Sequence, residues 1–158
     1  MRNRQELARY FASLGFKRGA EIGVCQGRYA QMLCQTIPGL ELTVIDPWPG
    51  DNNPNMLEAI DRLDGYDVEF VRATSLDAPK QIYDFVFIDG LHDYQSVKAD
   101  IEAWAPYARI VSGHDYHVEG VARAVNEYAD THKLDLNFTW WDLDNPIKDD
   151  RQPCWWYQ

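Results

Sequence analysis

Apolar residues recur along the chain with two alternating spacings. The first stretch has helical spacing, with Leu7, Tyr10, Phe11 and Leu14 at i, i+3, i+4 and i+7 on one face, and Gly15 follows as a residue that ends helices. Short apolar runs typical of buried strands then alternate with further helical stretches. Strands are predicted at residues 20–24, 40–45, 67–72, 82–88, 108–113, 136–141 and 154–158, and helices at 28–37, 56–63, 94–104 and 118–129.

This alternation predicts an α/β fold, a Rossmann-like, mostly parallel seven-stranded sheet with helices on both faces. The exception is residues 75–81 (SLDAPKQ), which are too few for a full helix between the third and fourth strands. Because the last two predicted strands have no helix between them, they should pair antiparallel at one edge. The acidic run at 142–151 is the expected turn between them. The length of 158 residues fits a single domain, 1–158.

The composition excludes some classes of partner. A net charge of −10 disfavours a general surface for nucleic acids or anionic membranes and leaves a small molecule as the expected partner. The three cysteines form neither a paired framework nor a CxxC motif, which indicates a reducing compartment. Since the N-terminal residues lack the apolar core of a signal peptide, a cytoplasmic protein is expected. Association into a homo-oligomer is compatible with the sequence.

The stretch EIGVCQG (21–27) indicates a cofactor site at the end of the first strand. It sets Glu21 before a turn that contains Gly23 and Gly27, and Asp46 ends the second strand about 20 residues later, where a ribose-binding acid is expected. A nicotinamide cofactor would favour GxGxxG, but Cys25 takes the middle glycine position. An acid on the first strand suits a cofactor with an amino group and no phosphate, such as S-adenosylmethionine. The alternative is that both glycines only form turns and the aspartate only caps a loop.

Four motifs carry a resemblance to a known family: ExGxxxG at 21–27, VIDPW at 44–48, FIDGLHDYQSVKADIEAW at 87–104 and GHDY at 113–116. With these, residues 19–128 resemble the class I S-adenosylmethionine-dependent methyltransferases, in particular the small-molecule O-methyltransferases that include macrocin O-methyltransferase relatives. The resemblance implies that Glu21, Gly23 and Gly27 line the methionine moiety. It further implies that Asp46 binds the ribose, and that Ser75 and Leu76 flank the adenine.

Acidic residues and histidines follow the fourth and fifth predicted strands. Asp89 and Asp115 end these neighbouring strands, so their carboxylates are candidate ligands of a divalent cation such as magnesium or manganese. His92 lies three residues after Asp89 and has the ordinary pKa of a general base. The family resemblance implies the same roles. It also makes His114 a candidate ligand in place of an acid, which would favour manganese, iron or zinc over magnesium.

The favoured function is methylation of a small hydroxylated acceptor, a sugar or a natural product, assisted by a divalent cation. One alternative is a metal-dependent oxygenase or hydrolase that uses Asp89, His92, His114 and Asp115. Another is a non-catalytic relative of the fold.

Other polar and aromatic residues have structural explanations. Asp93 is expected to cap the following helix, and His117 to be a hydrated loop residue. Six aromatic residues could line an acceptor pocket, but most are expected to pack in the core or on the edge strands: Trp48, Tyr116, Trp140, Trp141, Trp155 and Trp156.

Overall fold

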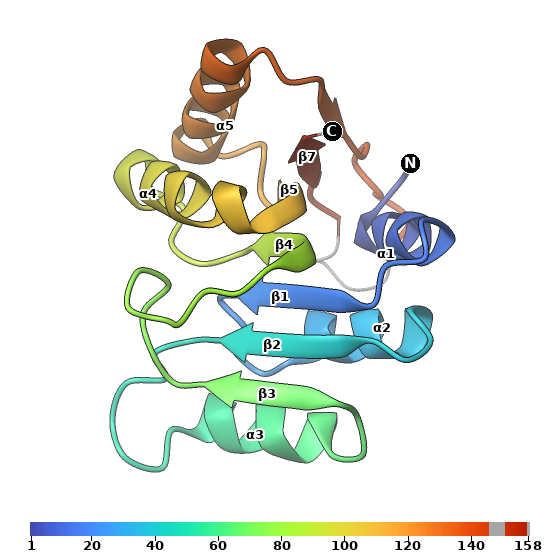
Figure 1. Ribbon diagram of the computed structural model, residues 1–158, viewed down its shortest axis with the longest axis vertical. Helices are drawn as coiled ribbons and strands as arrows, with labels where there is room; N and C mark the ends of the chain where they lie inside the picture. Colours follow the sequence, from blue (N-terminus) through green and yellow to red (C-terminus); the bar gives the residue numbers. More distant parts are fainter. Residues whose placement is uncertain (146–150, 158) are drawn as a thin grey trace.

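The computed structural model describes residues 1–145 and 151–157, in which five α-helices surround one sheet (Figure 1). The predicted turn at 142–151 falls partly, and the last residue of the final predicted strand falls wholly, outside the described residues. The helices are α1 (Arg4–Ser13), α2 (Arg28–Thr36), α3 (Pro54–Leu63), α4 (Tyr94–Trp104) and α5 (Glu119–His132), and a 3-10 turn, η1 (Ala105–Tyr107), follows α4. None of the described helices combines the length and the apolar character that crossing a membrane requires.

The sheet has the predicted seven strands in the order β3-β2-β1-β4-β5-β7-β6. They are β1 (Arg18–Ile22), β2 (Glu41–Ile45), β3 (Val68–Val71), β4 (Tyr83–Ile88), β5 (Ala108–Gly113), β6 (Leu136–Phe138) and β7 (Trp155–Tyr157). The first five are parallel, and β7 lies between β5 and β6 and runs antiparallel to both. The expected Rossmann-like sheet with an antiparallel pair at one edge is therefore confirmed.

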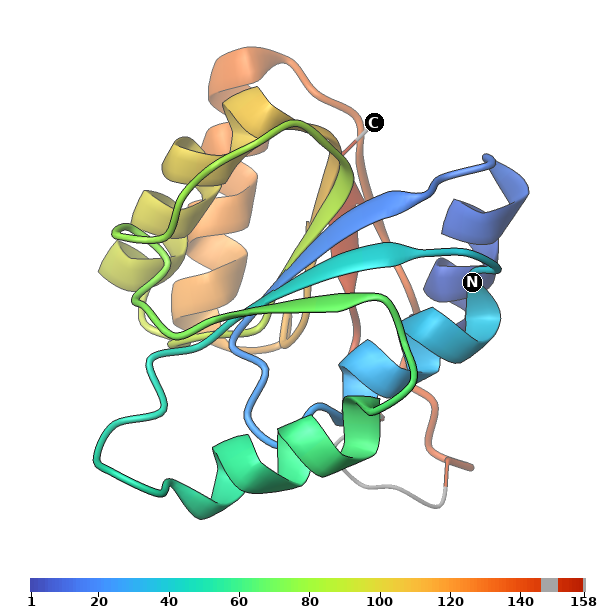
Figure 2. The same cartoon turned by 60° about the horizontal axis from the view of Figure 1, so that its bottom comes forward.

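Alternate residues of the central strands contribute to two hydrophobic cores. On β4, Phe85 and Phe87 face the core under α1, α2 and α3, whereas Val86 and Ile88 face the core under α4 and α5. Figures 1 and 2 show these two helical layers on opposite faces of the sheet. Burial on both faces explains why β4 reads as a continuous apolar run, and it fixes the register in which the strand ends meet.

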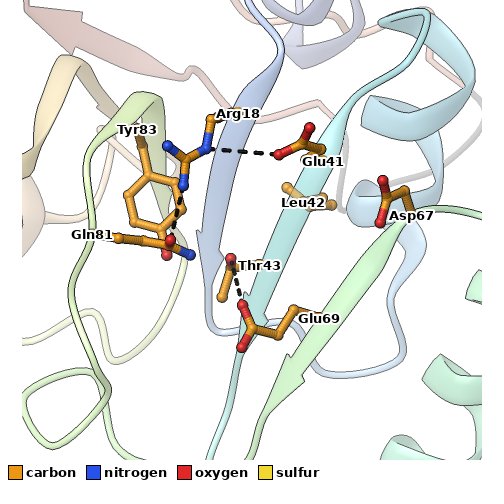
Figure 3. Close-up of a pocket in the computed structure, with 8 residues that line it drawn as sticks. All are labelled: Arg18, Glu41, Leu42, Thr43, Asp67, Glu69, Gln81 and Tyr83. Atoms are coloured by element: carbon orange, nitrogen blue, oxygen red, sulfur yellow. Dashed lines mark hydrogen bonds and ion pairs between the residues drawn. The ribbon is translucent and has the colours of Figure 1, made fainter.

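No helix forms between β3 and β4, as expected from the shortness of residues 75–81, and one part of the sheet is left without a helix over it. Figure 1 shows β1, β2 and β3 in front of α2 and α3, with no helix over their near face in the described chain. Polar side chains stand there instead and line a cavity of about 360 Å³, among them Arg18, Thr43 and Glu69 (Figure 3). These polar side chains keep the uncovered face hydrated, and the candidate functional residues lie elsewhere.

The late tryptophans divide between core and surface. Trp155 and Trp156 are buried, as the packing interpretation expected. The prediction of a strand over 136–141 is too long, because β6 ends at Phe138, and Trp140 and Trp141 are 75% and 51% exposed. These two residues are the exceptions to the expectation that most of the six aromatic residues are packed. β1 likewise begins two residues before the predicted start and leaves Gly23 in the following turn.

Trp155 joins the antiparallel edge to the parallel sheet. Its side chain is 0% exposed, and its indole nitrogen donates to the carbonyl oxygen of His114 at 3.1 Å. Gly113 on β5 makes room for the ring, because a Cβ there would lie 2.5 Å from it.

We expect Trp155→Ala to lower the free energy of unfolding by about 3–5 kcal/mol, because it opens a cavity in the core and removes a buried hydrogen bond. The matched change Trp140→Ala, at an exposed position, should alter it by less than about 0.5 kcal/mol. Urea unfolding followed by far-ultraviolet circular dichroism measures both. Similar losses in the two variants would contradict the assignment of Trp155 to the core.

Candidate functional site

The turn after β1 is held against the end of β4. Gly23 has φ +85°, and its N–H donates to the carbonyl oxygen of Ile45 at 2.9 Å. A Cβ on Gly23 would lie 2.1 Å from the carbonyl oxygen of Asp89, so a residue with a side chain cannot take this place. The second glycine, Gly27, has φ +72° and immediately precedes α2. The backbone thus requires a glycine at position 23 and favours one at position 27.

Glu21 is a buried acid without a hydrogen-bond partner for one oxygen among the described residues. The residue is 2% exposed, and Oε2 has no donor. Burial, and then the charges of Asp89 and Asp46, raise the pKa of Glu21 well above its ordinary value, although Arg4 acts in the opposite direction. Glu21 lines a cavity of about 240 Å³ together with Arg4, Gly23 and Asp89. This carboxyl group is suited to a positively charged part of a ligand.

The Asp46 side chain connects two loops. Its carboxylate accepts hydrogen bonds from the backbone N–H groups of Cys25 at 2.9 Å and Trp48 at 2.8 Å. The loop-capping alternative thus describes contacts that the residue makes. A carboxylate has about four lone-pair sites, so these two bonds leave it able to accept from a ribose hydroxyl as well.

A second cavity, of about 340 Å³, has mostly apolar walls, which include Ile22, Ile45 and Leu91. Ser75 and Leu76, to which the family resemblance assigns the adenine, line this cavity. Gly23 lines this cavity as well as the one beside Glu21, so the two cavities adjoin at the glycine turn.

The acidic residues and histidines after β4 and β5 meet in one cluster. Ligand atoms of Asp89, His92 and Asp115 all lie within 4.8 Å of one another, close enough to hold one metal ion. Nδ1 of His114 lies 3.7 Å from Asp89 Oδ1 and 3.3 Å from Asp115 Oδ2, but His114 is not part of that three-residue group. The cluster borders a cavity of about 290 Å³ lined by Arg4, Asp89, His92, His114, Asp115 and Gln152.

Ion pairs within the cluster shift the protonation of its members. Burial would lower the pKa of His114, but its hydrogen bonds and charge interactions with Asp115 and Asp89 outweigh burial and raise the pKa to about 9. Burial would likewise raise the pKa of Asp89, yet the hydrogen bonds from His114 and His92 hold it below the ordinary value. The hydrogen bond to Asp89 raises the pKa of His92. A metal ion would therefore have to displace protons from the imidazoles it binds.

Asp115 has a left-handed backbone conformation, and its side chain contacts two histidines. Its φ of +53° lies in the left-handed region, which aspartate tolerates better than most residues. The carboxylate reaches His92 Nε2 at 3.3 Å and also His117 Nδ1 at 3.5 Å. His117 is an exposed loop residue, as expected, and contacts the Trp141 ring edge-on with centroids 5.0 Å apart. Asp93 caps α4 by accepting from two backbone N–H groups, which confirms its structural role.

Two residues of the site were not predicted from the sequence. Arg4, on the first turn of α1, is 8% exposed, lies 3.7 Å from Asp89 Oδ2 and covers the Tyr29 ring at 5.1 Å. Asp100, on α4, is 6% exposed and accepts a hydrogen bond from Ser75 Oγ. Each is a charged residue on the apolar stripe of an amphipathic helix, and that position is the sequence signal that could have identified them.

Comparison with known proteins identifies the family. A family model described as a methyltransferase domain matches residues 20–116, so the chain belongs to this family. The family match confirms that the chain is a class I S-adenosylmethionine-dependent methyltransferase. No curated protein matches the sequence.

Solved structures share the fold at low sequence identity. The O-methyltransferase from Bacillus cereus in complex with SAH (S-adenosylhomocysteine) has a TM-score of 0.74 at 16% identity over 98% of this chain and 80% of that chain. Cofactor-bound Rv0187 from MTB has a TM-score of 0.74 at 18% identity over 98% of this chain and 78% of that chain. The O-methyltransferase TomG from Streptomyces achromogenes, involved in tomaymycin synthesis and in complex with SAM, has a TM-score of 0.67 at 17% identity over 98% and 78% of the two chains.

The raised pKa of Glu21 predicts a pH-dependent affinity for S-adenosylmethionine. A cationic ligand binds the ionised carboxylate, so at low pH binding must first remove a proton from Glu21, and affinity should rise as pH increases above the range in which an ordinary glutamate ionises. In Glu21→Gln the affinity should be lower, and its pH dependence over this range should disappear. Isothermal titration calorimetry measures both. A pH slope that persists unchanged in Glu21→Gln would show that another group is responsible.

Proposed function

We propose that the protein transfers a methyl group from S-adenosylmethionine to a hydroxyl oxygen of a small acceptor, a sugar or a natural product, with help from a divalent cation. The observation that carries the proposal is the continuity of three cavities along the ends of the strands. Gly23 lines both the cavity beside Glu21 and the apolar cavity, and Asp89 and Arg4 line both the cavity beside Glu21 and the one at the acid–histidine cluster. A nucleoside, its charged amino-acid tail and an acceptor can thus lie in sequence along one rim of the sheet.

The residues of the first two cavities fit the cofactor. The apolar cavity with Ser75 and Leu76 accommodates adenine, Asp46 at the neighbouring strand end takes the ribose, and Glu21 takes the cationic amino group. S-adenosylmethionine supplies the methyl group. The Bacillus and Streptomyces methyltransferases, whose structures are complexes with SAH and SAM, support this cofactor.

Asp89 and Asp115 would hold the cation, with His114 as a third candidate ligand. A magnesium or manganese ion held there would lower the pKa of an acceptor hydroxyl. His92 is then the general base that takes the hydroxyl proton, and its half-exposed ring lies next to both aspartates. His92 is also close enough to act as a ligand, and one imidazole nitrogen cannot do both, so the two roles predict different effects of substitution.

The mixed set of carboxylates and imidazoles also supports a second candidate, a metal-dependent oxygenase or hydrolase that needs no methyl donor. Calorimetry separates the two candidates, because a methyltransferase should bind SAH and an oxygenase or hydrolase without a methyl donor should not. Binding of SAH supports methyl transfer, whereas iron or zinc binding without SAH binding supports the alternative. A non-catalytic relative would bind SAH and transfer no methyl group to any acceptor.

Asp115→Asn should weaken manganese binding to the SAH-saturated protein by about tenfold or more, because it replaces an anionic ligand by a neutral one. The affinity for SAH itself should change little. Asp130→Asn, the same change on the exposed side of α5, is the matched control. Equal manganese affinities in the two variants, measured by calorimetry, would remove Asp115 from the metal site.

His92→Ala should lower kcat for methyl transfer by about 10²–10⁴ and leave SAH affinity unchanged, as expected for loss of a general base. SAH formation from S-adenosylmethionine, with a panel of small catechols and sugars as acceptors, provides the measurement. Manganese affinity decides between the two roles of His92: it stays constant if the residue is the base and falls if the residue is a ligand. Unchanged turnover in His92→Ala and in Asp89→Asn would refute the assigned roles.

A further inference from the structure

We propose that Asp100 determines the specificity of the cofactor site for adenine, by accepting a hydrogen bond from the 6-amino group of the base. The inference rests on the nucleoside part of the proposed function. It assigns recognition of the adenine 6-amino group to a residue of α4, whereas the other proposed cofactor contacts come from the glycine turn and the loops that follow the strands.

Asp100 is the acidic side chain in a cavity with otherwise mostly apolar walls. The residue is 6% exposed and lines the cavity together with Ile22, Ile45 and Leu91. Burial of a carboxylate among apolar side chains is unfavourable unless hydrogen-bond donors surround it. Burial raises the pKa of Asp100, against the opposing effects of a hydrogen bond from Ser75 and the charge of Lys80.

The two oxygens of Asp100 have different surroundings. Oδ1 accepts the hydrogen bond from Ser75 Oγ. Oδ2 has no donor among the described residues, and it lies 3.7 Å from the place where a Cβ on Gly90 would stand. Gly90 itself lines the cavity. Because Gly90 has no side chain, Oδ2 is left open towards the space that the base would fill.

The loop that carries Ser75 is firmly anchored. The carbonyl oxygen of Ser75 accepts from Trp104 Nε1 at 3.2 Å and from Lys80 Nζ at 3.4 Å, and Lys80 also bonds to two further carbonyl oxygens of the loop. Trp104 lies on α4, one turn after Asp100. The hydroxyl–carboxylate pair is thus oriented before any ligand arrives, which lowers the entropic cost of recognition.

Adenine matches this cavity better than other purines. Its flat faces suit the apolar walls, and its 6-amino group is a donor for the free carboxylate oxygen. Hypoxanthine would place a carbonyl oxygen in the same position, and an acceptor opposite a carboxylate is unfavourable. The ribose hydroxyls are assigned to Asp46 at the end of β2, so they do not compete for Asp100.

Calorimetry with two nucleosides tests the inference: SAH, and its analogue with an unsubstituted purine, which lacks only the 6-amino group. The wild-type protein should bind SAH about tenfold or more tightly than the analogue, the ratio expected for a hydrogen bond to a charged acceptor. In Asp100→Ala the ratio should fall below about threefold, because SAH binding weakens and analogue binding does not. The inosine form of SAH should bind the wild-type protein more weakly than either.

Further variants separate direct recognition from loop anchoring. Ser75→Ala keeps the carboxylate and should keep the discrimination, and Glu102→Ala, an exposed change on the same helix, is the matched control. If Asp100→Ala fails to fold, Asp100→Asn keeps the shape and should still reduce the ratio about threefold or more, because it removes the charge.

Three outcomes overturn the inference. An equal weakening of both nucleosides by Asp100→Ala, or an equal loss of discrimination in Ser75→Ala, leaves Asp100 with a structural role while the proposed function stands. Failure of the wild-type protein to bind any of the nucleosides overturns the inference together with the nucleoside part of the proposed function.

Discussion

The contact between the β1–α2 turn and the end of β4 is the constraint on which the site depends. Here the backbone of Gly23 lies so close to the carbonyl group of Asp89 that no Cβ fits between them. This approach follows from the parallel pairing of β1 with β4, in which Ile22 is the register partner of Ile88. The next residues of both strands are therefore forced together. Two cavities adjoin at Gly23, and Asp89 borders the third, so a single backbone contact joins all three.

The site also concentrates buried charge in a protein that is strongly acidic overall. Glu21, Asp89 and Asp100 each have little exposure to solvent, and removing carboxylates from water is costly. Asp89 is stabilised by Arg4 and by two imidazoles, whereas Asp100 has one hydroxyl donor and one oxygen of Glu21 has no donor among the described residues. The two incompletely satisfied acids line the cavities proposed for the cofactor, whereas Asp89, which also borders one of them, has its partners at the acid–histidine cluster. The protein retains its unfavourable carboxyl groups where a cationic or amino-bearing ligand can satisfy them.

The sequence predicts the mostly parallel sheet and the strand-end acids for a common physical reason. Parallel strands expose their carboxyl ends at one rim, so Asp46, Asp89 and Asp115 could be placed there from the apolar runs that precede them. Arg4 and Asp100 follow no strand, so their only signal is a charged residue on the apolar stripe of a helix, and that signal indicates burial without saying which site the side chain joins. The sequence groups His92 and His114 with the two aspartates, but it could not show that His114 lies outside the three-residue ligand group, because that depends on side-chain positions. Trp140 and Trp141 continue an apolar run beyond β6, and pattern alone does not separate exposed tryptophans from buried ones.

The shared position of Asp89 has a consequence for how the two ends of the site interact. Its carboxylate lies near Glu21 on one side, where its charge raises the pKa of that residue, and contacts His92 and His114 on the other. A cation at the acid–histidine cluster would partly neutralise Asp89, and this would lower the pKa of Glu21 and favour its ionised form. The same cation would weaken the attraction between Asp89 and a positive cofactor group. The sign of the coupling between the two sites thus depends on which of these effects is larger, and Arg4, which borders both cavities, moderates each of them.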